Sequence, residues 1–148
     1  MEKKLLTLLH IEDNILDHRL VVEYLKDYPF AEFDIHHAES FAKAKEYLNI
    51  YKYNIILVDL GLSDVKADFV VASLLQYQST SAVIILTGSH NDEQLFKYFE
   101  LGIDEIVVKG AFQPPVLPRR LLIAHLRAQR RIKQPEALHL LRMKLRAK

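Results

Sequence analysis

Ile55-Ile56-Leu57-Val58-Asp59 is the stretch that decides the fold class of this chain of 148 residues. Such near-continuous apolar runs are typical of strands that are buried on both faces, as in a parallel sheet covered by helices. Leu5–Ile11 and Ala82–Thr87 have the same character, and Phe33–His37 and Glu105–Lys109 complete a set of five expected strands. The sequence therefore predicts a buried, parallel sheet.

The segments between these strands repeat apolar residues at helical spacing. Ser40 and Asn91 are the expected N-caps of two helices, and Gly102 is expected just past the end of the fourth. The alternation of strands and helices predicts a doubly wound α/β fold, in which right-handed crossovers place helices on both faces of the sheet. The expected helices are Leu20–Tyr28, Phe41–Tyr51, Phe69–Tyr77, Asp92–Leu101 and Leu117–Ile132.

Charge divides the chain into an acidic body and a basic end. Residues 1–118 carry 10 Lys and Arg against 18 Asp and Glu, whereas residues 119–148 carry 10 against one. We expect one domain over residues 4–133, followed by a basic helical extension or linker over residues 134–148, with a short helix at Glu136–Ala147 after Pro135. A solvated helix end explains such a segment more simply than a contact surface, and helix plus charge alone does not favour nucleic-acid binding.

The composition also limits the compartment and the kinds of site. The chain has no Cys, which excludes disulfides and thiolate metal sites and is compatible with a reducing compartment. The apolar run Leu5–Ile11 ends in two acids without a cleavage site, and no run approaches the roughly 18 apolar residues of a membrane span. We therefore expect a cytoplasmic protein. The seven His include no pair at metal-binding helical spacing, and adjacent His36 and His37 should face opposite sides of a strand, so we expect no His ligands.

Polar side chains follow the strands at the edge where ligands bind in open α/β sheets. Glu12 and Asp13 end the first strand, Asp59 the third, Thr87 the fourth and Lys109 the fifth. Each alone could be a cap or an edge charge. Together, three carboxylates repel one another unless a cation offsets them, and Mg²⁺ is a natural compensator. A carboxylate nucleophile, a metal, a Lys and a hydroxyl are what phosphoryl transfer requires.

Four ordered stretches carry a resemblance to a known family, namely Leu8–Asn14, Ile55–Asp64, Ile84–Gly88 and Ile106–Gly110. With them the sequence resembles a receiver domain of a two-component response regulator over about residues 4–133. The resemblance implies a flavodoxin-like sheet with strand order 2-1-3-4-5. It also implies phosphorelay signalling: a phosphoprotein that catalyses its own Mg²⁺-dependent phosphorylation and dephosphorylation, rather than an enzyme with a separate substrate.

The resemblance assigns a role to each residue of the pocket. Asp59 would accept the phosphoryl group from a sensor histidine kinase or a phosphotransfer protein, and Thr87 and Lys109 would hold the phosphoryl oxygens. The implied Mg²⁺ ligands are Asp13 and Asp59 directly, Glu12 through water, and the Gly61 carbonyl. Phosphorylation would then shift a conformational switch on the face formed by the fourth helix, fifth strand and fifth helix.

The sequence departs from the family pattern at three positions outside the pocket's polar set. Ile106 stands where an aromatic switch residue is usual, Gly110 where a cis Pro is common, and Ser63 where Pro is frequent. Because a cis bond before a residue other than Pro costs about 2.5–4 kcal/mol, we predict a trans bond between Lys109 and Gly110. The small residues Gly61 and Ser89 should leave an acyl phosphate open to water, so a large side chain at either position should change its lifetime.

Two other functions stay open at this point. The chain could be a receiver-like binding module that signals without phosphorylation, through protein contacts or its basic end. A metal-dependent phosphatase is less favoured, because that chemistry commonly has a second Asp two residues after the nucleophile and Gly61 stands there. After residue 133 only about 15 residues remain, too few for an output domain. Output would then be by contact with an effector protein, or the chain is a fragment lacking its output domain, and a homodimer through the basic segment stays open.

Overall fold

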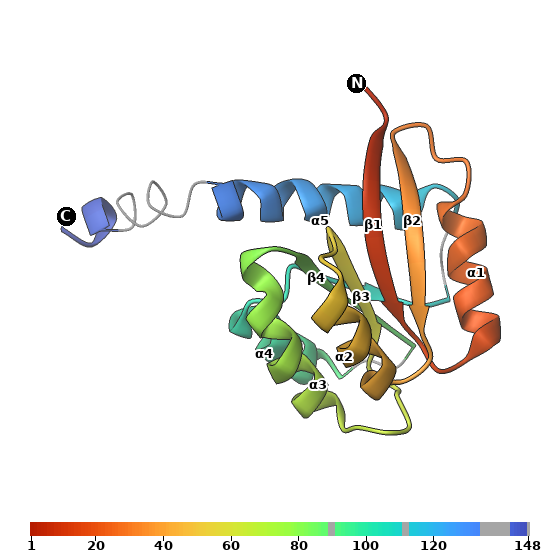
Figure 1. The fold of residues 1–148 in the computed structure, drawn as a ribbon. Coiled ribbons are helices and arrows are strands. Elements are labelled where there is room, and N and C mark those ends of the chain that lie inside the picture. The colour runs from red at the N-terminus through yellow and green to blue at the C-terminus, as the bar shows by residue number, and fades with distance from the viewer. Residues whose placement is uncertain (89–90, 111–112, 134–142, 148) are drawn as a thin grey trace.

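Five parallel strands form the sheet, in the order β2-β1-β3-β4-β5. The structure is a computed structural model that describes residues 1–88, 91–110, 113–133 and 143–147. The strand order confirms the doubly wound arrangement expected for a flavodoxin-like sheet (Figure 1). The strands are β1 (Lys4–Ile11), β2 (Ala31–Ala38), β3 (Ile55–Asp59), β4 (Ala82–Thr87) and β5 (Glu105–Val108).

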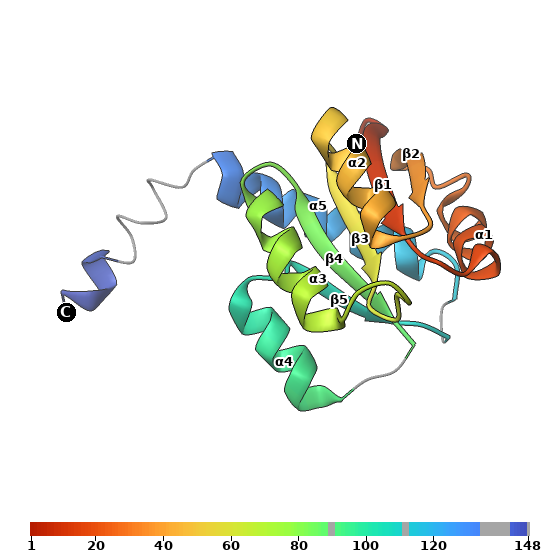
Figure 2. The same cartoon turned by 60° about the horizontal axis from the view of Figure 1, so that its bottom comes forward.

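Helices cover both faces of this sheet. α1 and α5 pack on one face, and α2, α3 and α4 pack on the other, as the two views in Figures 1 and 2 show. The helices are α1 (Ile15–Leu25), α2 (Phe41–Ile50), α3 (Ala67–Leu74), α4 (Asp92–Leu101) and α5 (Val116–Lys133), and a 3₁₀ turn, η1 (Leu75–Ser79), follows α3.

The alternation of side chains along β1 shows how one strand serves two cores. Leu6 and Leu8 pack in the core beneath α1 and α5, whereas Leu9 and Ile11 pack in the core beneath α2, α3 and α4. Every residue of β3 and β4 is buried, since both faces of these central strands are covered. This burial is the physical reason for the near-continuous apolar runs in the sequence.

Three helix boundaries differ from expectation by three residues or more. α1 ends at Leu25 rather than at Tyr28. α1 begins at Ile15, not near Leu20, because the Asn14 side chain accepts hydrogen bonds from the backbone N–H groups of Leu16 and Asp17 and so caps the helix earlier. The third helix is regular only to Leu74, after which the chain tightens into η1. Because α1 starts early, Asp17 lies in its first turn, close to the end of β1.

The predicted caps and turns are confirmed. Ser40 Oγ accepts from the Lys43 N–H at 3.0 Å, and Asn91 Oδ1 accepts from the Gln94 N–H at 3.2 Å. Gly102 ends α4 in the left-handed region, with φ of +118°. Pro114–Pro115 is the cis peptide bond among the described residues, so the bond before Gly110 is trans, as predicted.

Part of the basic charge of α5 is used inside the domain. Arg120 and Arg127 contact Glu105 at 3.1 and 3.3 Å, and Arg131 contacts Asp104 at 2.5 Å. These pairs tie α5 to the start of β5. The contrast between an acidic body and a basic end therefore has a partly structural explanation.

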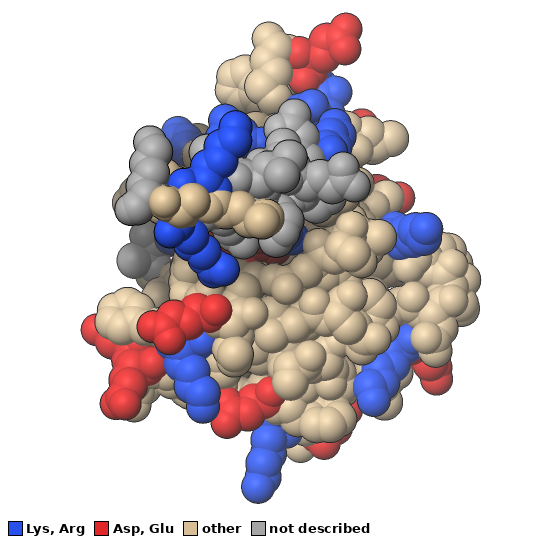
Figure 3. Space-filling model, turned by 90° about the vertical axis from the view of Figure 1, so that its left-hand side faces the viewer, with Lys and Arg blue, Asp and Glu red and all other residues tan. Residues whose placement is uncertain are grey.

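Figure 3 shows further basic side chains on the side of the molecule toward which α5 ends. Of the helix expected at Glu136–Ala147, residues 136–142 lie outside the described part of the chain, and residues 143–146 are helical. Within the described ranges, no helix is long and apolar enough to cross a membrane.

Candidate functional site

The carboxyl ends of the strands bring four of the expected residues to one edge of the sheet. Glu12 follows β1, Asp59 ends β3, Thr87 ends β4, and Lys109 follows β5. The Lys109 ammonium donates to Glu12 Oε1 at 2.8 Å and forms a short contact with Asp59 Oδ2. The backbone N–H of Lys109 also donates to the Thr87 carbonyl at 2.7 Å, which places the Lys109 backbone beside the end of β4.

The two buried carboxyls of the site have opposite protonation tendencies. Glu12 is fully buried; burial, and next its hydrogen bond with Asp59, raises its pKa to about 7 despite the nearby Lys109. Burial also opposes ionisation of Asp59, but hydrogen bonds with Glu12, Lys109 and the Gly61 N–H outweigh burial and lower the pKa of Asp59. Asp59 is thus held as the carboxylate, which is the form that can act as a nucleophile.

Lys109 supplies the positive charge that makes this arrangement stable. Burial disfavours its charged form, but hydrogen bonds to Asp59, Glu12 and Asp17 raise the pKa of Lys109 above its ordinary value. An ammonium that stays charged beside Asp59 can stabilise the negative oxygens of a group transferred there.

The remaining expected residues lie around this centre in different ways. Asp13 is exposed, and its Oδ2 accepts from the Ser63 N–H at 3.2 Å, so it borders the loop after β3. The Gly61 N–H donates to Asp59 Oδ1 at 2.8 Å. Thr87 is buried at the end of β4. The structure thus places Asp13 beside the loop after β3, away from the contacts of Lys109.

Asp17 joins the site and was not expected there. Its Oδ2 accepts from the Lys109 ammonium at 2.9 Å. The sequence contained one signal for it: if Asn14 caps the helix, Asp17 falls in the first turn, next to the end of β1. We missed this signal because the helix was expected to begin near Leu20.

The donor set fits a hard divalent cation. Carboxylate oxygens of Glu12, Asp17 and Asp59 lie within 4.8 Å of one another. Mg²⁺ prefers such oxygen ligands and usually keeps several waters. Asp13 is not part of this group; its carboxylate contacts the Ser63 N–H in the loop after β3, and the Gly61 N–H contacts Asp59.

Comparison with known proteins decides the family. The family model described as the response regulator receiver domain matches residues 8–121. The chain belongs to this family. This receiver domain resembles many solved receiver structures, whereas a comparison with curated proteins found no match.

Three solved structures illustrate the likeness. The signal receiver domain of a protein described as a LuxO repressor, from Vibrio parahaemolyticus, is 24% identical, with a TM-score of 0.73 over 84% of this chain and 92% of that one. A CheY-like receiver domain protein from Methanospirillum hungatei JF-1 is 15% identical, with a TM-score of 0.72 over 86% and 98%. The Mn²⁺-bound response regulator Rcp1 is 26% identical, with a TM-score of 0.64 over 78% and 88%. The first two show the fold alone.

The receiver domain carries an aliphatic residue at its expected switch position. Ile106 is 9% exposed and packs in the core beneath α2, α3 and α4. Gly110 has φ of +102°, a left-handed conformation that suits glycine, and a Cβ built there would meet no atom within 4 Å. Any readout that runs through β5 in this domain therefore begins from an aliphatic side chain.

Three histidines form a cluster beside Glu12 that the sequence did not predict. His18 stacks on His37 with ring centroids 3.8 Å apart, and His10 Nδ1 lies 2.9 Å from His18 Nδ1. Burial, and then the neighbouring His18, His37 and Lys109, lower the pKa of His10 to about 3, so its ring is neutral. His37 Nε2 donates to the Glu12 carbonyl at 2.7 Å. The cluster therefore packs α1 onto the ends of β1 and β2.

Other His expectations have mixed outcomes. His36 contacts Tyr53 while His37 contacts His18, so the two do face opposite sides of β2. His90 and His139 lie outside the described residues. The expectation that the His are not metal ligands stays a prediction.

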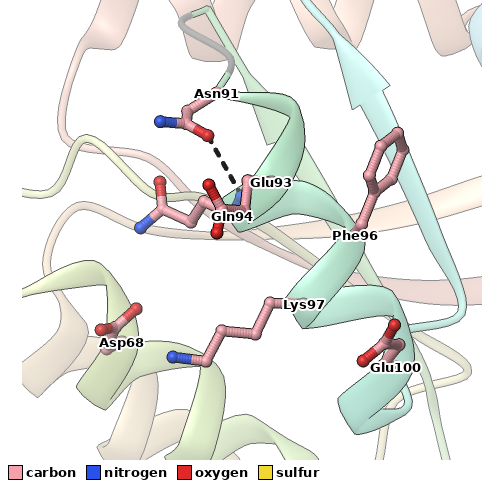
Figure 4. A pocket seen from close by; sticks show the side chains of 7 residues that line it. All are labelled: Asp68, Asn91, Glu93, Gln94, Phe96, Lys97 and Glu100. Carbon is pink, nitrogen blue, oxygen red and sulfur yellow. Dashed lines mark hydrogen bonds between the residues drawn. The ribbon is translucent and has the colours of Figure 1, made fainter.

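A cavity of about 650 Å³ lies against α3 and α4. In Figure 4 the side chains of Asp68 and Lys97 face each other across it. Beside it, the buried Tyr98 hydroxyl donates to Asp68 Oδ1 at 2.5 Å and accepts from Gln94 Nε2 at 2.8 Å. These contacts fasten α4 to α3.

Proposed function

We propose that Asp59 accepts a phosphoryl group from a sensor histidine kinase or a phosphotransfer protein, and that residues 4–133 form the receiver domain. One observation carries the proposal: a buried strand-end carboxylate, held ionised, contacts the ammonium of Lys109 at the edge where three carboxylates meet. The family membership supports the same role.

The transfer needs no general base at the acceptor. A carboxylate oxygen of Asp59 attacks the phosphorus of a phosphohistidine, the P–N bond breaks, and the imidazole leaves with the bonding electrons. The product is an acyl phosphate on Asp59. The Lys109 ammonium and the Thr87 hydroxyl would bind the transferred oxygens, and both residues stand at neighbouring strand ends.

Mg²⁺ would supply charge neutralisation for the transferred group. We assign Asp13, Asp59 and the Gly61 carbonyl as direct ligands and Glu12 as a ligand through water. Their oxygen donors suit this ion, and the related Rcp1 structure is described as Mn²⁺-bound. The receiver domain would thereby catalyse its own phosphorylation and dephosphorylation.

Output would use the face formed by α4, β5 and α5. Exposed apolar side chains there include Phe96 and Phe99 on α4, Val108 on β5 and Ile123 on α5. Such a patch suits contact with an effector protein or an output domain. Residues 134–148 would be an extension or linker to that partner.

The decisive test is intact-mass measurement after incubation with Mg²⁺ and acetyl phosphate. We expect one phosphoryl adduct on the wild-type chain and none on Asp59→Asn. Asp34→Asn is the matched control, because Asp34 is an exposed Asp on edge strand β2 and its loss should leave the adduct intact. An unmodified wild type would favour the second candidate, a binding module that signals through protein contacts alone. Turnover of added phosphate esters would instead support a phosphatase.

The lifetime of the acyl phosphate should depend on position 61. A Cβ at Gly61 would lie 3.4 Å from Asp59 Oδ1, so a large side chain there would stand between the acceptor and water. Gly61→Tyr should change the rate of phosphate loss, and an unchanged rate would contradict this idea. Ser89, the other small neighbour expected from the sequence, lies outside the described residues.

A further inference from the structure

Lys109 divides its hydrogen bonds among three carboxylates that have different parts in the proposed reaction. An ammonium has three N–H donors, and those of Lys109 go to Glu12 at 2.8 Å, to Asp17 at 2.9 Å and to Asp59. Asp59 is the proposed acceptor, so its oxygens change partner when phosphorus is bound. Glu12 is assigned to Mg²⁺ through water, so its oxygens are shared with that ion. Asp17 is the one of these three partners of Lys109 that is neither the acceptor nor an assigned ligand of Mg²⁺.

The backbone fixes Asp17 in place. Its N–H donates to Asn14 Oδ1 at 3.2 Å in the cap of α1, and the neighbouring His18 stacks on His37 of β2. The carboxylate of Asp17 thus projects from a helix end that is anchored to the sheet. An acid in a first turn also stabilises the helix N-terminus, but that effect does not require contact with Lys109. The ion pair of 2.9 Å between the Asp17 carboxylate and the Lys109 ammonium is therefore an additional interaction, which stabilisation of the helix N-terminus does not explain.

The Lys109 ammonium could move into a neighbouring cavity if no contact held it beside Asp59. A cavity of about 240 Å³ lies beside it, lined by Asp17, Lys109 and Gly110 together with the apolar side chains Leu20, Val21, Tyr24 and Leu86. Lys carries a compact charge on a flexible four-carbon stem, so its head group is easily displaced. Because the Asp17 backbone is anchored at the start of α1, its carboxylate restricts the positions that the ammonium can take beside this cavity.

We infer that Asp17 is a positioning residue, which holds the Lys109 ammonium beside Asp59 so that Lys109 can bind the phosphoryl oxygens as they arrive. The inference rests on the proposed function of Asp59. Asp17 itself touches neither the transferred group nor the attacking oxygen. Asp17 limits the motion of the Lys109 side chain, which binds the transferred group. Less conformational entropy of Lys109 is then lost on reaching the transition state.

Asp17→Asn tests the inference, because it preserves the size of the side chain and removes its charge. Loss of charge alone would reduce repulsion and speed the reaction with an anionic donor such as acetyl phosphate. Loss of positioning predicts the opposite, a rate of adduct formation about fivefold lower, since a charged hydrogen bond that is partly exposed is lost. Glu23→Gln removes an exposed acid from the same helix without a Lys109 contact, and its rate should equal or exceed that of wild type.

Two further readouts separate this role from others. In the protein without metal, the ¹⁵N-detected ammonium signal of Lys109 should exchange faster with water in Asp17→Asn than in wild type or Glu23→Gln. The slower adduct formation should also persist at saturating Mg²⁺. An unchanged ammonium signal, an unchanged or faster reaction, or recovery at high Mg²⁺ would each overturn the inference. A wild type that forms no adduct would refute the proposed function, and the ammonium signal would still decide whether Asp17 holds Lys109.

Discussion

Glu12 gives the receiver domain a pH-dependent stability that can be worked out from its burial. Its side chain is fully buried, and its pKa rises from 4.5 in the unfolded chain to about 7 in the folded protein. Between pH 4.5 and 7 the folded state therefore holds a proton that the unfolded state has lost, and stability falls as pH rises through this window. Each pKa unit is worth about 1.4 kcal/mol, so this one carboxyl should cost about 3 kcal/mol by pH 8.

Glu12→Gln isolates this effect, because the amide imitates the protonated carboxyl and does not titrate. We expect urea unfolding in EDTA to show that the free energy of unfolding of Glu12→Gln, relative to that of wild type, rises by about 3 kcal/mol from pH 4.5 to pH 8. Glu23→Gln, at an exposed position of α1, provides the control for general charge effects. A difference between wild type and Glu12→Gln that stays constant across this range would refute the reasoning.

Three further predictions concern the framework that positions the site, each measured by urea unfolding. Leu57→Ala, at a fully buried position of β3, should cost about 3 kcal/mol, whereas Leu5→Ala, at a side chain 70% exposed, should cost less than about 0.5 kcal/mol. Gly102→Ala should lower the free energy of unfolding by more than about 1 kcal/mol, because φ is +118° and a Cβ would lie 2.6 Å from Gln78 Nε2. Gly88→Ala is the control, because its Cβ would lie 3.7 Å from the nearest atom. Ser40→Ala should cost about 1 kcal/mol through loss of the α2 cap, and an unchanged free energy of unfolding would show that Ser40 contributes no capping energy.

The sheet could be predicted from the sequence because strands that are buried on both faces have near-continuous apolar sequences. β3 and β4 are apolar up to their last residues, which are Asp59 and Thr87, so the edge that bears the site could be predicted from the sequence. Caps at Ser40 and Asn91 were predictable for a similar reason, since each depends on backbone groups within three residues.

Contacts that depend on how a helix packs on the sheet could not be predicted in this way. Asp17 and Lys109 are 92 residues apart, and their meeting depends on where α1 begins and how it lies on β1. His10, His18 and His37 come from three elements and share no sequence spacing that would indicate a stack. Local sequence signals specify where helices and strands form. Contacts such as these depend in addition on how the helices pack against the sheet.

The proposed phosphoryl acceptance and its proposed readout rest on different physical grounds in this receiver domain. The acceptor end is polar, and Lys109 ties Glu12, Asp17 and Asp59 together through charged hydrogen bonds. Towards the expected output face, β5 instead presents Ile106 to the core, and α4 is fastened to α3 through Tyr98 and Asp68. Because an aliphatic side chain has no polar group to exchange partners, a signal that passes Ile106 must travel as a change of packing. Movement of α4 would then have to strain or break the contact between Tyr98 and Asp68, so that hydrogen bond would set part of the free energy that the proposed phosphorylation has to supply.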